Sequence, residues 1–139
     1  RAGAGAAGSL PEFVKHLGGE NTVLQYWGAA GCRALDAKAA PAREALRKAM
    51  KTSPSPSVRM KAAEVLCRLG DSEEPLAVLQ AYLTDPDAWT RVHAAVTLGW
   101  LGPRARAAIP ALEKAARDAA KDKERYPKLS AENALLYIR

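Results

Sequence analysis

Residues 85–102 read DPDAWTRVHAAVTLGWLG, and their pattern decides the fold because the chain carries it three times. Residues 91–102 (RVHAAVTLGWLG) align with residues 59–70 (RMKAAEVLCRLG), 32 residues earlier, and with residues 25–36 (QYWGAAGCRALD), a further 34 residues earlier. Self-similarity at such a period is the signature of a helical repeat architecture. The shared positions are the small pairs Gly28–Ala29, Ala62–Ala63 and Ala94–Ala95 and the closing residues Leu35, Leu69 and Leu101.

Helix start and stop residues flank these copies. Residues 53–56 (SPSP) precede the second copy and residues 85–87 (DPD) precede the third, and both combine N-cap residues with a proline near the first turn. Gly70 and Gly102 end the later copies, as glycine commonly ends helices. The sequence therefore predicts helices over residues 25–36, 59–70 and 91–102.

A second helix follows each copy. Apolar residues recur with the 3.6-residue period over residues 41–51, 74–83 and 105–120. Residues 9–17 (SLPEFVKHL) are interpreted as a short second helix without its partner, and residues 127–139 (PKLSAENALLYIR) as a first helix without its partner. The chain is thus expected to hold a half-repeat, three helix pairs and a terminal half-repeat, with about seven or eight helices in all.

These helices predict an all-α fold, a short right-handed α-solenoid of antiparallel helix pairs. One helical hairpin cannot bury its own apolar face, whereas stacked hairpins make a continuous core, and small Ala and Gly residues let the helices approach closely. We expect one repeat domain over residues 9–139. Residues 1–8 are rich in Ala and Gly, and they are interpreted equally well as the frayed remnant of a removed helix or as a flexible linker.

Composition excludes several other classes of protein. The chain has 139 residues, and aromatic residues make up only 6%, which disfavours a sandwich or barrel. No apolar run is long enough for a transmembrane span, and two Cys are too few for a disulfide-stapled miniprotein. The first residue is Arg1 and no signal-peptide pattern follows it, so we expect a processed or excised piece of a longer protein.

Residues 85–102 resemble a HEAT-type repeat, whose pattern is an Asp-Pro turn, Val-Arg, paired Ala and Leu-Gly-x-Leu-Gly. The third copy departs from this pattern only at Thr90, which replaces the usual Val. Ser53 stands in place of the turn Asp in the second copy, and the first copy has Gln25 for the Arg and Asp36 for the final Gly. The resemblance extends over residues 9–139, and it implies that the second helices line a concave face.

A narrower resemblance concerns residues 26–31 (YWGAAG), 56–59 (PSVR) and 89–92 (WTRV). They are similar to the C-terminal repeats of some bacterial arylsulfatase-type hydrolases. In that family the nucleophile lies in a Cys/Ser-x-Pro-x-Arg motif of a separate, preceding α/β domain, and neither Cys32 nor Cys67 stands in such a motif. The resemblance therefore implies an accessory domain that binds its parent catalytic domain, and an exported location, periplasmic or secreted.

We predict no catalytic, metal or cofactor residues in this chain. His16 and His93 stand apart without the clustered ligands that a metal needs, and neither Cys has a nearby His to activate it. Cys32 and Cys67 are interpreted as core thiols in preference to a disulfide bridge, and Glu73 with Glu74 as charges that favour the start of a helix.

The net charge of +6 raises the question of a polyanion site. Two predicted second helices carry basic stripes, but the one between them, residues 74–83, has no Lys or Arg, so a continuous phosphate track is not predicted. An ordinary solvated face is the favoured interpretation of both stripes, and contact with a polyanion or partner is the alternative. The candidates for such contact are Arg43, Arg47, Lys51, Lys114, Arg117 and Lys121, together with Trp100, which takes the place of Arg68 in the preceding copy and is expected to be exposed.

Other repeat positions are interpreted as structural. Arg59 and Arg91 are equivalent, and we expect them to satisfy carbonyls or to pair with an Asp such as Asp85 of a neighbouring turn, in preference to forming an anion-binding ladder. Trp27 and Trp89 are expected to pack between helices in preference to binding carbohydrate. Ala62, Ala63, Ala94 and Ala95 are expected at close helix approaches.

The leading hypothesis is a non-catalytic HEAT-type accessory domain of a sulfatase-like hydrolase. One alternative is a basic solenoid that binds nucleic acid, for which Trp89 near Asp87 is the one hint. The other is a scaffold domain that binds a protein partner.

Overall fold

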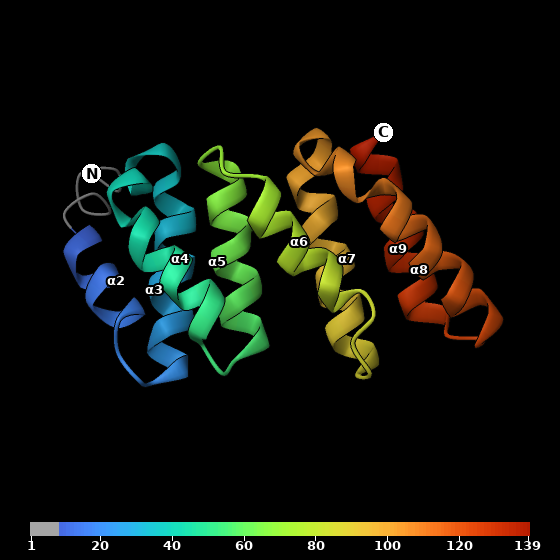
Figure 1. Ribbon diagram of the computed structural model, residues 1–139, viewed down its shortest axis with the longest axis horizontal. Coiled ribbons are helices and arrows are strands. Elements are labelled where there is room, and N and C mark those ends of the chain that lie inside the picture. Colours follow the sequence, from blue (N-terminus) through green and yellow to red (C-terminus); the bar gives the residue numbers. More distant parts are fainter. Residues whose placement is uncertain (1–8) are drawn as a thin grey trace. The chain divides into compact units, whose positions relative to one another are not determined.

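The computed structural model describes residues 9–139, and over that range the backbone forms helices and turns without a strand (Figure 1). The predicted all-α class is confirmed. The described residues divide into two compact units, unit 1 up to residue 71 and unit 2 over residues 72–139. The expectation for residues 1–8 lies outside the described residues. Within the described range no helix has the length and apolar character needed to cross a membrane.

Unit 1 consists of two helical hairpins. Helix α2 packs on α3, and α4 packs on α5, in each case across a short turn that makes the two helices antiparallel neighbours. Helix α3 also packs along α5. The elements are α2 (Leu10–Leu17), α3 (Thr22–Leu35), the 3-10 segment η1 (Asp36–Ala42), α4 (Arg43–Thr52) and α5 (Pro56–Arg68).

Unit 2 repeats this plan. Helix α6 packs on α7 and α8 on α9, while α7 and α9 lie along each other (Figure 1). In both units, therefore, the closest hairpin consists of the predicted second helix of one repeat and the predicted first helix of the next repeat. The elements are α6 (Glu73–Tyr82), α7 (Ala88–Leu101), the 3-10 segment η2 (Gly102–Ala108), α8 (Ile109–Lys121) and α9 (Arg125–Ile138).

Two segments that were expected to be loop or α-helix are 3-10 helices. The prediction of α-helix from residue 41 and from residue 105 was wrong at these starts, because η1 and η2 occupy the first residues of both ranges. The 3-10 geometry aligns side chains at i and i+3, and this spacing places Ala39 with Ala42, and Ala105 with Ala108, in the core. The repeat of alanines at spacing three is a sequence feature that could have identified both segments.

The first helices of the three copies begin in the same way. Asn21, Ser55 and Asp87 occupy equivalent positions, and the side-chain oxygen of each accepts a hydrogen bond from a backbone N–H in the first turn of α3, α5 and α7. Such caps satisfy donors that the helix itself leaves unpaired, typically stabilising it by about 1 kcal/mol. The predicted caps at Ser55 and Asp87 are confirmed, and Asn21 is the equivalent cap that the sequence reading missed.

The small residues of the copies lie where helices meet. Ala62, Ala63, Ala94 and Ala95 are all buried, as predicted. Gly28 and Gly31 lie where α3 approaches α2 closely, because a Cβ added at Gly28 would stand 2.7 Å from the Phe13 carbonyl oxygen and one added at Gly31 would stand 2.4 Å from the Phe13 ring. Side chains at these positions therefore limit how closely the helices can pack.

The ends of α3 and α7 share an unusual backbone conformation. Gly102 has φ 59° and ψ −136°, and Asp36, at the equivalent position of the first copy, has φ 56° and ψ −128°. Glycine adopts this region readily, whereas a residue with a Cβ is strained there. The first copy, which has Asp36 in place of this glycine, therefore keeps the same backbone conformation, and Asp36 carries the strain.

We expect Asp36→Gly to raise the free energy of unfolding by about 1 kcal/mol, because relief of strain exceeds the added entropy of the unfolded chain. Chemical denaturation measures this change. Ala37→Gly is the matched control: Ala37 is the neighbouring exposed residue without a positive φ, and its change should lower stability instead. Equal destabilisation by both variants would contradict the assignment of strain to Asp36.

Candidate functional site

Arg59 and Arg91 bind backbone carbonyls that precede their own helices, in the last turn of α4 for Arg59 and in the turn after α6 for Arg91. Arg59 Nε donates to the Met50 carbonyl at 2.8 Å. Arg91 Nη1 donates to the Asp85 carbonyl at 2.7 Å, and its Nη2 pairs with Glu124 at the start of α9. These bonds engage Arg59 Nε and both Nη atoms of Arg91 inside the fold, which favours the structural interpretation of the two positions over an anion-binding ladder.

The equivalent position of the first copy makes the same kind of contact with a different residue. Gln25 Nε2 donates to the Gly19 carbonyl at 2.7 Å, and Ser53 Oγ donates to Gln25 Oε1 at 2.8 Å. Both side chains are buried. Gln25 and Ser53, which depart from the repeat pattern, thus form one polar bridge between two turns of unit 1.

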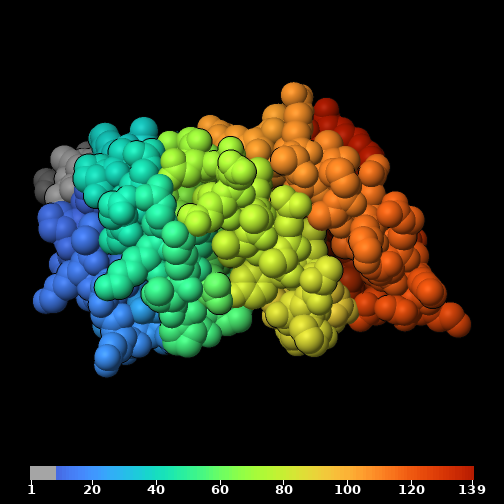
Figure 2. All heavy atoms as spheres, viewed as in Figure 1, coloured from blue at the N-terminus to red at the C-terminus, as the bar shows by residue number. Residues whose placement is uncertain are grey.

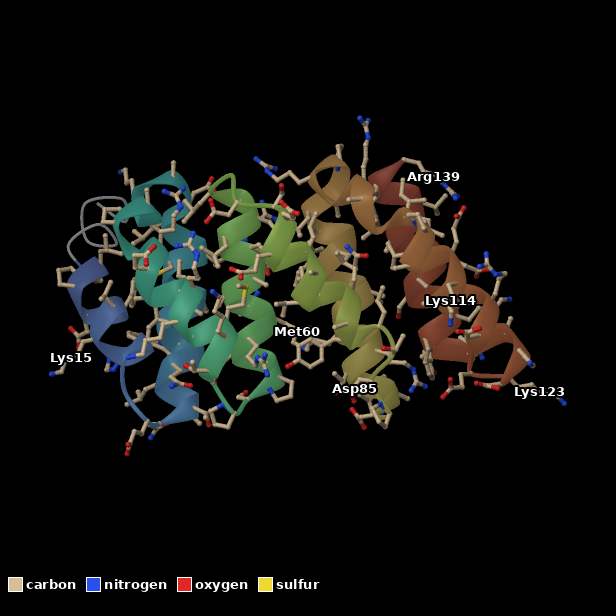
Figure 3. All side chains as sticks on the ribbon, viewed as in Figure 1. Lys15, Met60, Asp85, Lys114, Lys123 and Arg139 are labelled. Atoms are coloured by element: carbon tan, nitrogen blue, oxygen red, sulfur yellow. The ribbon has the colours of Figure 1, made fainter. Side chains whose placement is uncertain are left out.

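The backbone carbonyl of Asp85 accepts a hydrogen bond from Arg91, whereas its carboxylate accepts one within the turn in which Asp85 lies. Asp85 Oδ1 accepts a hydrogen bond from the Asp87 backbone N–H at 2.9 Å. Asp85 lies in the turn between α6 and α7 (Figure 3). Of the two contacts expected for a repeat Arg, with a carbonyl or with an Asp carboxylate, Arg91 makes the first with Asp85.

The basic stripe on α4 is largely engaged by the end of α5. Arg43 Nη2 donates to the Leu69 carbonyl at 2.8 Å, and Arg47 Nη2 pairs with Asp71 at 2.9 Å. Positive charge at a helix C-terminus is favourable for the helix dipole. Two of the three stripe residues therefore hold α4 to α5, and Lys51 lies exposed in the last turn of α4.

The basic stripe on α8 contains a carboxylate. Lys114 Nζ, which projects from α8 in Figure 3, pairs with Asp118 Oδ2 at 2.7 Å. The hydrogen bond from Lys114, with the nearby charges of Arg117 and Lys121, lowers the pKa of Asp118. The stripe therefore presents alternating charge, which attracts polyanions less than an uninterrupted cationic row would.

A pocket of about 450 Å³ lies beside this stripe within unit 2. Its wall combines the turn before α7 with α7, α8 and α9, and Ala95 forms part of the floor. The charged groups on its wall have both signs, and two of the pairs just described belong to it, so it shows no preference for an anion. The charged lining residues are Arg91, Lys114, Asp118, Asp122 and Glu124.

The three tryptophans are all exposed. Trp100 is 57% exposed, as predicted, but Trp27 at 56% and Trp89 at 65% are equally so. Trp27 and Trp89, which were expected to pack between helices, each contact a ring of a neighbouring helix but are not buried. Trp27 packs edge-on against Phe13 of α2, and Trp89 stacks on Tyr126 of α9 with ring centroids 5.8 Å apart.

An aromatic groove runs between α7 and α9 in unit 2. It has a volume of about 330 Å³. Trp100 on α7 and Tyr126 and Tyr137 on α9 supply its rings, and each of the three is more than half exposed. The remaining lining residues are Val96, Gly99, Leu129, Ser130, Asn133 and Ala134. Sequence analysis selected Trp100 alone, although Tyr137 occupies the corresponding place near the end of α9.

Asp87 is committed to its helix cap. Its carboxylate accepts hydrogen bonds from both the backbone N–H and the hydroxyl of Thr90, and these bonds lower its pKa. The pairing of Trp89 with a nearby acidic residue, the hint of a nucleic-acid site, is thus explained by capping of α7.

Glu64 is a buried charge that the sequence analysis missed. Its side chain is 1% exposed, and it pairs with Arg33 of α3 at 3.0 Å and with Lys61 at 2.8 Å. Arg68 lies 3.4 Å away. Burial acts to raise the pKa of Glu64, but the hydrogen bonds and charges of Lys61 and Arg33 outweigh it and lower the pKa. An acid inside the apolar run 62–67, with cations three residues before and four after it, was the available signal.

The two cysteines are buried in the core of unit 1 and are not joined in a disulfide, which agrees with the expected core thiols. Burial raises the pKa of Cys32 to about 11, so it is a thiol at neutral pH and a poor nucleophile. Among residues 9–139 there is no group of three His, Cys, Asp or Glu side chains placed to hold a metal ion.

We expect Glu64→Gln to lower the free energy of unfolding by about 3 kcal/mol at pH 7, because it leaves three cations without their buried partner. The folded pKa of Glu64 is below the ordinary value of 4.5, so its contribution is present above pH 4.5 and is lost as the pH falls through the folded pKa. The stability difference between wild type and variant, measured by denaturant titration, should narrow below pH 4.5.

Glu44→Gln provides the control for this measurement. Glu44 pairs with Arg47 but its side chain is 85% exposed, so its loss should change stability by about 0.5 kcal/mol or less. A pH-independent difference for Glu64→Gln, or equal effects of the two variants, would contradict the buried ion cluster.

Comparison with known proteins supports the repeat pattern. The family model described as HEAT repeats matches residues 43–131, which are more than half of the chain and extend from α4 into α9. No curated protein matches the chain significantly. These findings do not support the narrower similarity to sulfatase-associated repeats. With its aligned caps, paired small residues and stacked helical hairpins, the chain belongs to the HEAT repeat family.

Proposed function

We propose that this chain is a non-catalytic interaction domain that binds a protein partner through unit 2. The observation that carries the proposal is the aromatic groove, whose rings lie exposed on α7 and α9. Next to it on α9, Leu136 is 77% exposed. Contiguous exposed apolar surface marks interaction sites, and Trp and Tyr are enriched in protein interfaces.

The distribution of charge favours a protein partner over a polyanion. Arg43, Arg47 and Arg91 are paired with carboxylates or carbonyls, and Lys114 is paired with Asp118. Atoms of α8 form much of the visible face of unit 2 in Figure 2, and this helix carries acidic as well as basic groups. Polyanion binding depends on cations that are available to replace counterions, and these four are already engaged.

The inertness of the thiols supports a role without catalysis. A hydrolase of esters needs an activated nucleophile or a metal-bound water, with a base within reach. Cys32 is held as a thiol by burial, and Cys67 is buried as well. The binding function is therefore expected to reside in surface shape and not in reactive groups.

Partner capture tests the proposal. The wild-type chain, the double variant Trp100→Ala/Tyr137→Ala and the control Trp27→Ala are immobilised and exposed to extract from the source cells, and a captured protein is then purified and titrated. We expect the double variant to bind about tenfold or more weakly, since exposed aromatic anchors dominate interfaces. Trp27, on unit 1 and equally exposed, should be dispensable. Equal binding by all three variants, or hydrolysis of sulfate esters by the purified chain, would refute the proposal.

A finer version names the partner as the catalytic domain of a sulfatase-type hydrolase in the same polypeptide. Its support is the sequence similarity of residues 26–31, 56–59 and 89–92 to repeats of such enzymes. We expect the coding sequence upstream of Arg1 to encode an α/β domain with a Cys/Ser-x-Pro-x-Arg motif. An upstream sequence that encodes a different domain would exclude this version and leave the general interaction role intact.

A further inference from the structure

We propose that the aromatic groove between α7 and α9 binds an apolar, proline-rich segment of the partner, flanked by an acidic residue, in the extended polyproline II conformation. This inference rests on the proposed interaction function and specifies the chemistry of the partner. It follows from the rings of the groove, its charge, its hydrogen-bonding groups and its size.

The rings provide flat apolar surfaces suited to pyrrolidine rings. Tyr137 is 70% exposed, Tyr126 58% and Trp100 57%, so the three stand at the edges of the groove and not beneath it. Gly99 contributes no side chain to the wall between them. Grooves lined by aromatic rings are the usual receptors of polyproline II segments, whose stiffness reduces the entropy lost on binding.

The charge of the groove selects against ionic ligands. None of the nine residues of its wall is charged. Just beyond it, the Arg125 guanidinium lies 6.0 Å from the centre of the Tyr126 ring. A neutral groove with a cation at one end complements an apolar segment flanked by an acidic residue, and it offers a phosphate chain no row of cations.

The hydrogen-bonding groups favour a peptide over an oligosaccharide. Ser130 Oγ donates to the Tyr126 carbonyl at 2.8 Å, so its hydroxyl proton is already used. A sugar presents several hydroxyls that need partners, and the groove has few polar groups to serve them. A polyproline II backbone has only carbonyl acceptors along its prolines, which the Asn133 amide and the tyrosine hydroxyls at the rim can satisfy.

The size of the groove favours an extended strand over a helix. Its volume of about 330 Å³ is less than that of a single helical turn, a cylinder about 10–12 Å across and about 5.4 Å long. Where helices do pack in this unit, the contact is made by small residues: a Cβ on Gly99 would lie 3.2 Å from the Ala134 Cα. Large rings at the rim keep another helix from such a close approach.

The test uses the full chain and synthetic peptides. The probe is an acetylated, amidated peptide with one Asp followed by six prolines, and the comparison peptide replaces the prolines with alternating Gly and Ser. Calorimetric titration should show the proline peptide binding about tenfold or more tightly, a difference of about 1.4 kcal/mol. A hexasaccharide of glucose and a single-stranded DNA 20-mer, titrated in parallel, should bind more weakly than the proline peptide.

Matched variants locate the site. Tyr137→Ala should lower the affinity for the proline peptide by about tenfold. The affinity should stay within about threefold of wild type for Tyr137→Phe, which keeps the ring, and for Trp27→Ala, which lies outside the groove. Arg125→Ala should weaken binding of the proline peptide through loss of the contact with its Asp, and this effect should shrink with added salt. Thermal melting of each variant establishes that it is folded.

The outcomes separate this inference from the proposed function. Failure of the proline peptide to bind, retention of its binding by folded Tyr137→Ala, or tighter binding of the saccharide or DNA would overturn the inference. Suppose that the proline peptide does not bind but the double variant Trp100→Ala/Tyr137→Ala binds the captured protein more weakly than wild type does. The proposed interaction function is then supported, and only the polyproline II chemistry is wrong.

Discussion

The hairpins α2–α3, α4–α5 and α6–α7 depend on one recurring hydrogen bond, from the side chain at the fourth residue of α3, α5 or α7 to a backbone carbonyl that precedes that helix. Gln25, Arg59 and Arg91 make this bond in the three copies, to Gly19, Met50 and Asp85. Each of these carbonyls lies in the turn, or at the end of the preceding helix, just before the chain reverses direction into the next helix. A long polar side chain that satisfies this carbonyl fixes the path of the turn, and the small residues that follow then determine how closely the helices pack.

The charges of the protein are used largely for such internal ties. Arg43 and Arg47 hold the end of α5, Arg91 joins α7 to the start of α9, and Glu64 gathers three cations in unit 1. Each ion pair removes one cation and one anion, so the net charge of +6 stays with the other side chains, while the arginines named above are already engaged. The exposed surface that differs most from an ordinary solvated face is aromatic, and it lies on α7 and α9 of unit 2.

Strain and substitution in the first copy show how far the repeat tolerates change. Gln25 replaces an arginine and keeps its contact with a turn carbonyl, and Asp36 replaces a glycine and keeps its positive φ. The backbone path is thus set by packing of the hairpins as a whole, and single positions adapt to it at a cost in local energy. The first copy therefore keeps the contact and the backbone conformation of the repeat at positions where its sequence departs from the HEAT pattern.

The sequence by itself determined the helical class, the register of three copies, the caps at Ser55 and Asp87 and the buried alanines. All of these depend on local propensity and on the 3.6-residue period, which neighbouring residues encode. Only the tertiary structure decided which helices form the close hairpins, that Glu64 is buried among cations, and that Trp100, Tyr126 and Tyr137 share a groove. These features join residues of different helices, and burial of a charge or exposure of a ring is set by the helices packed around it, which no local pattern specifies.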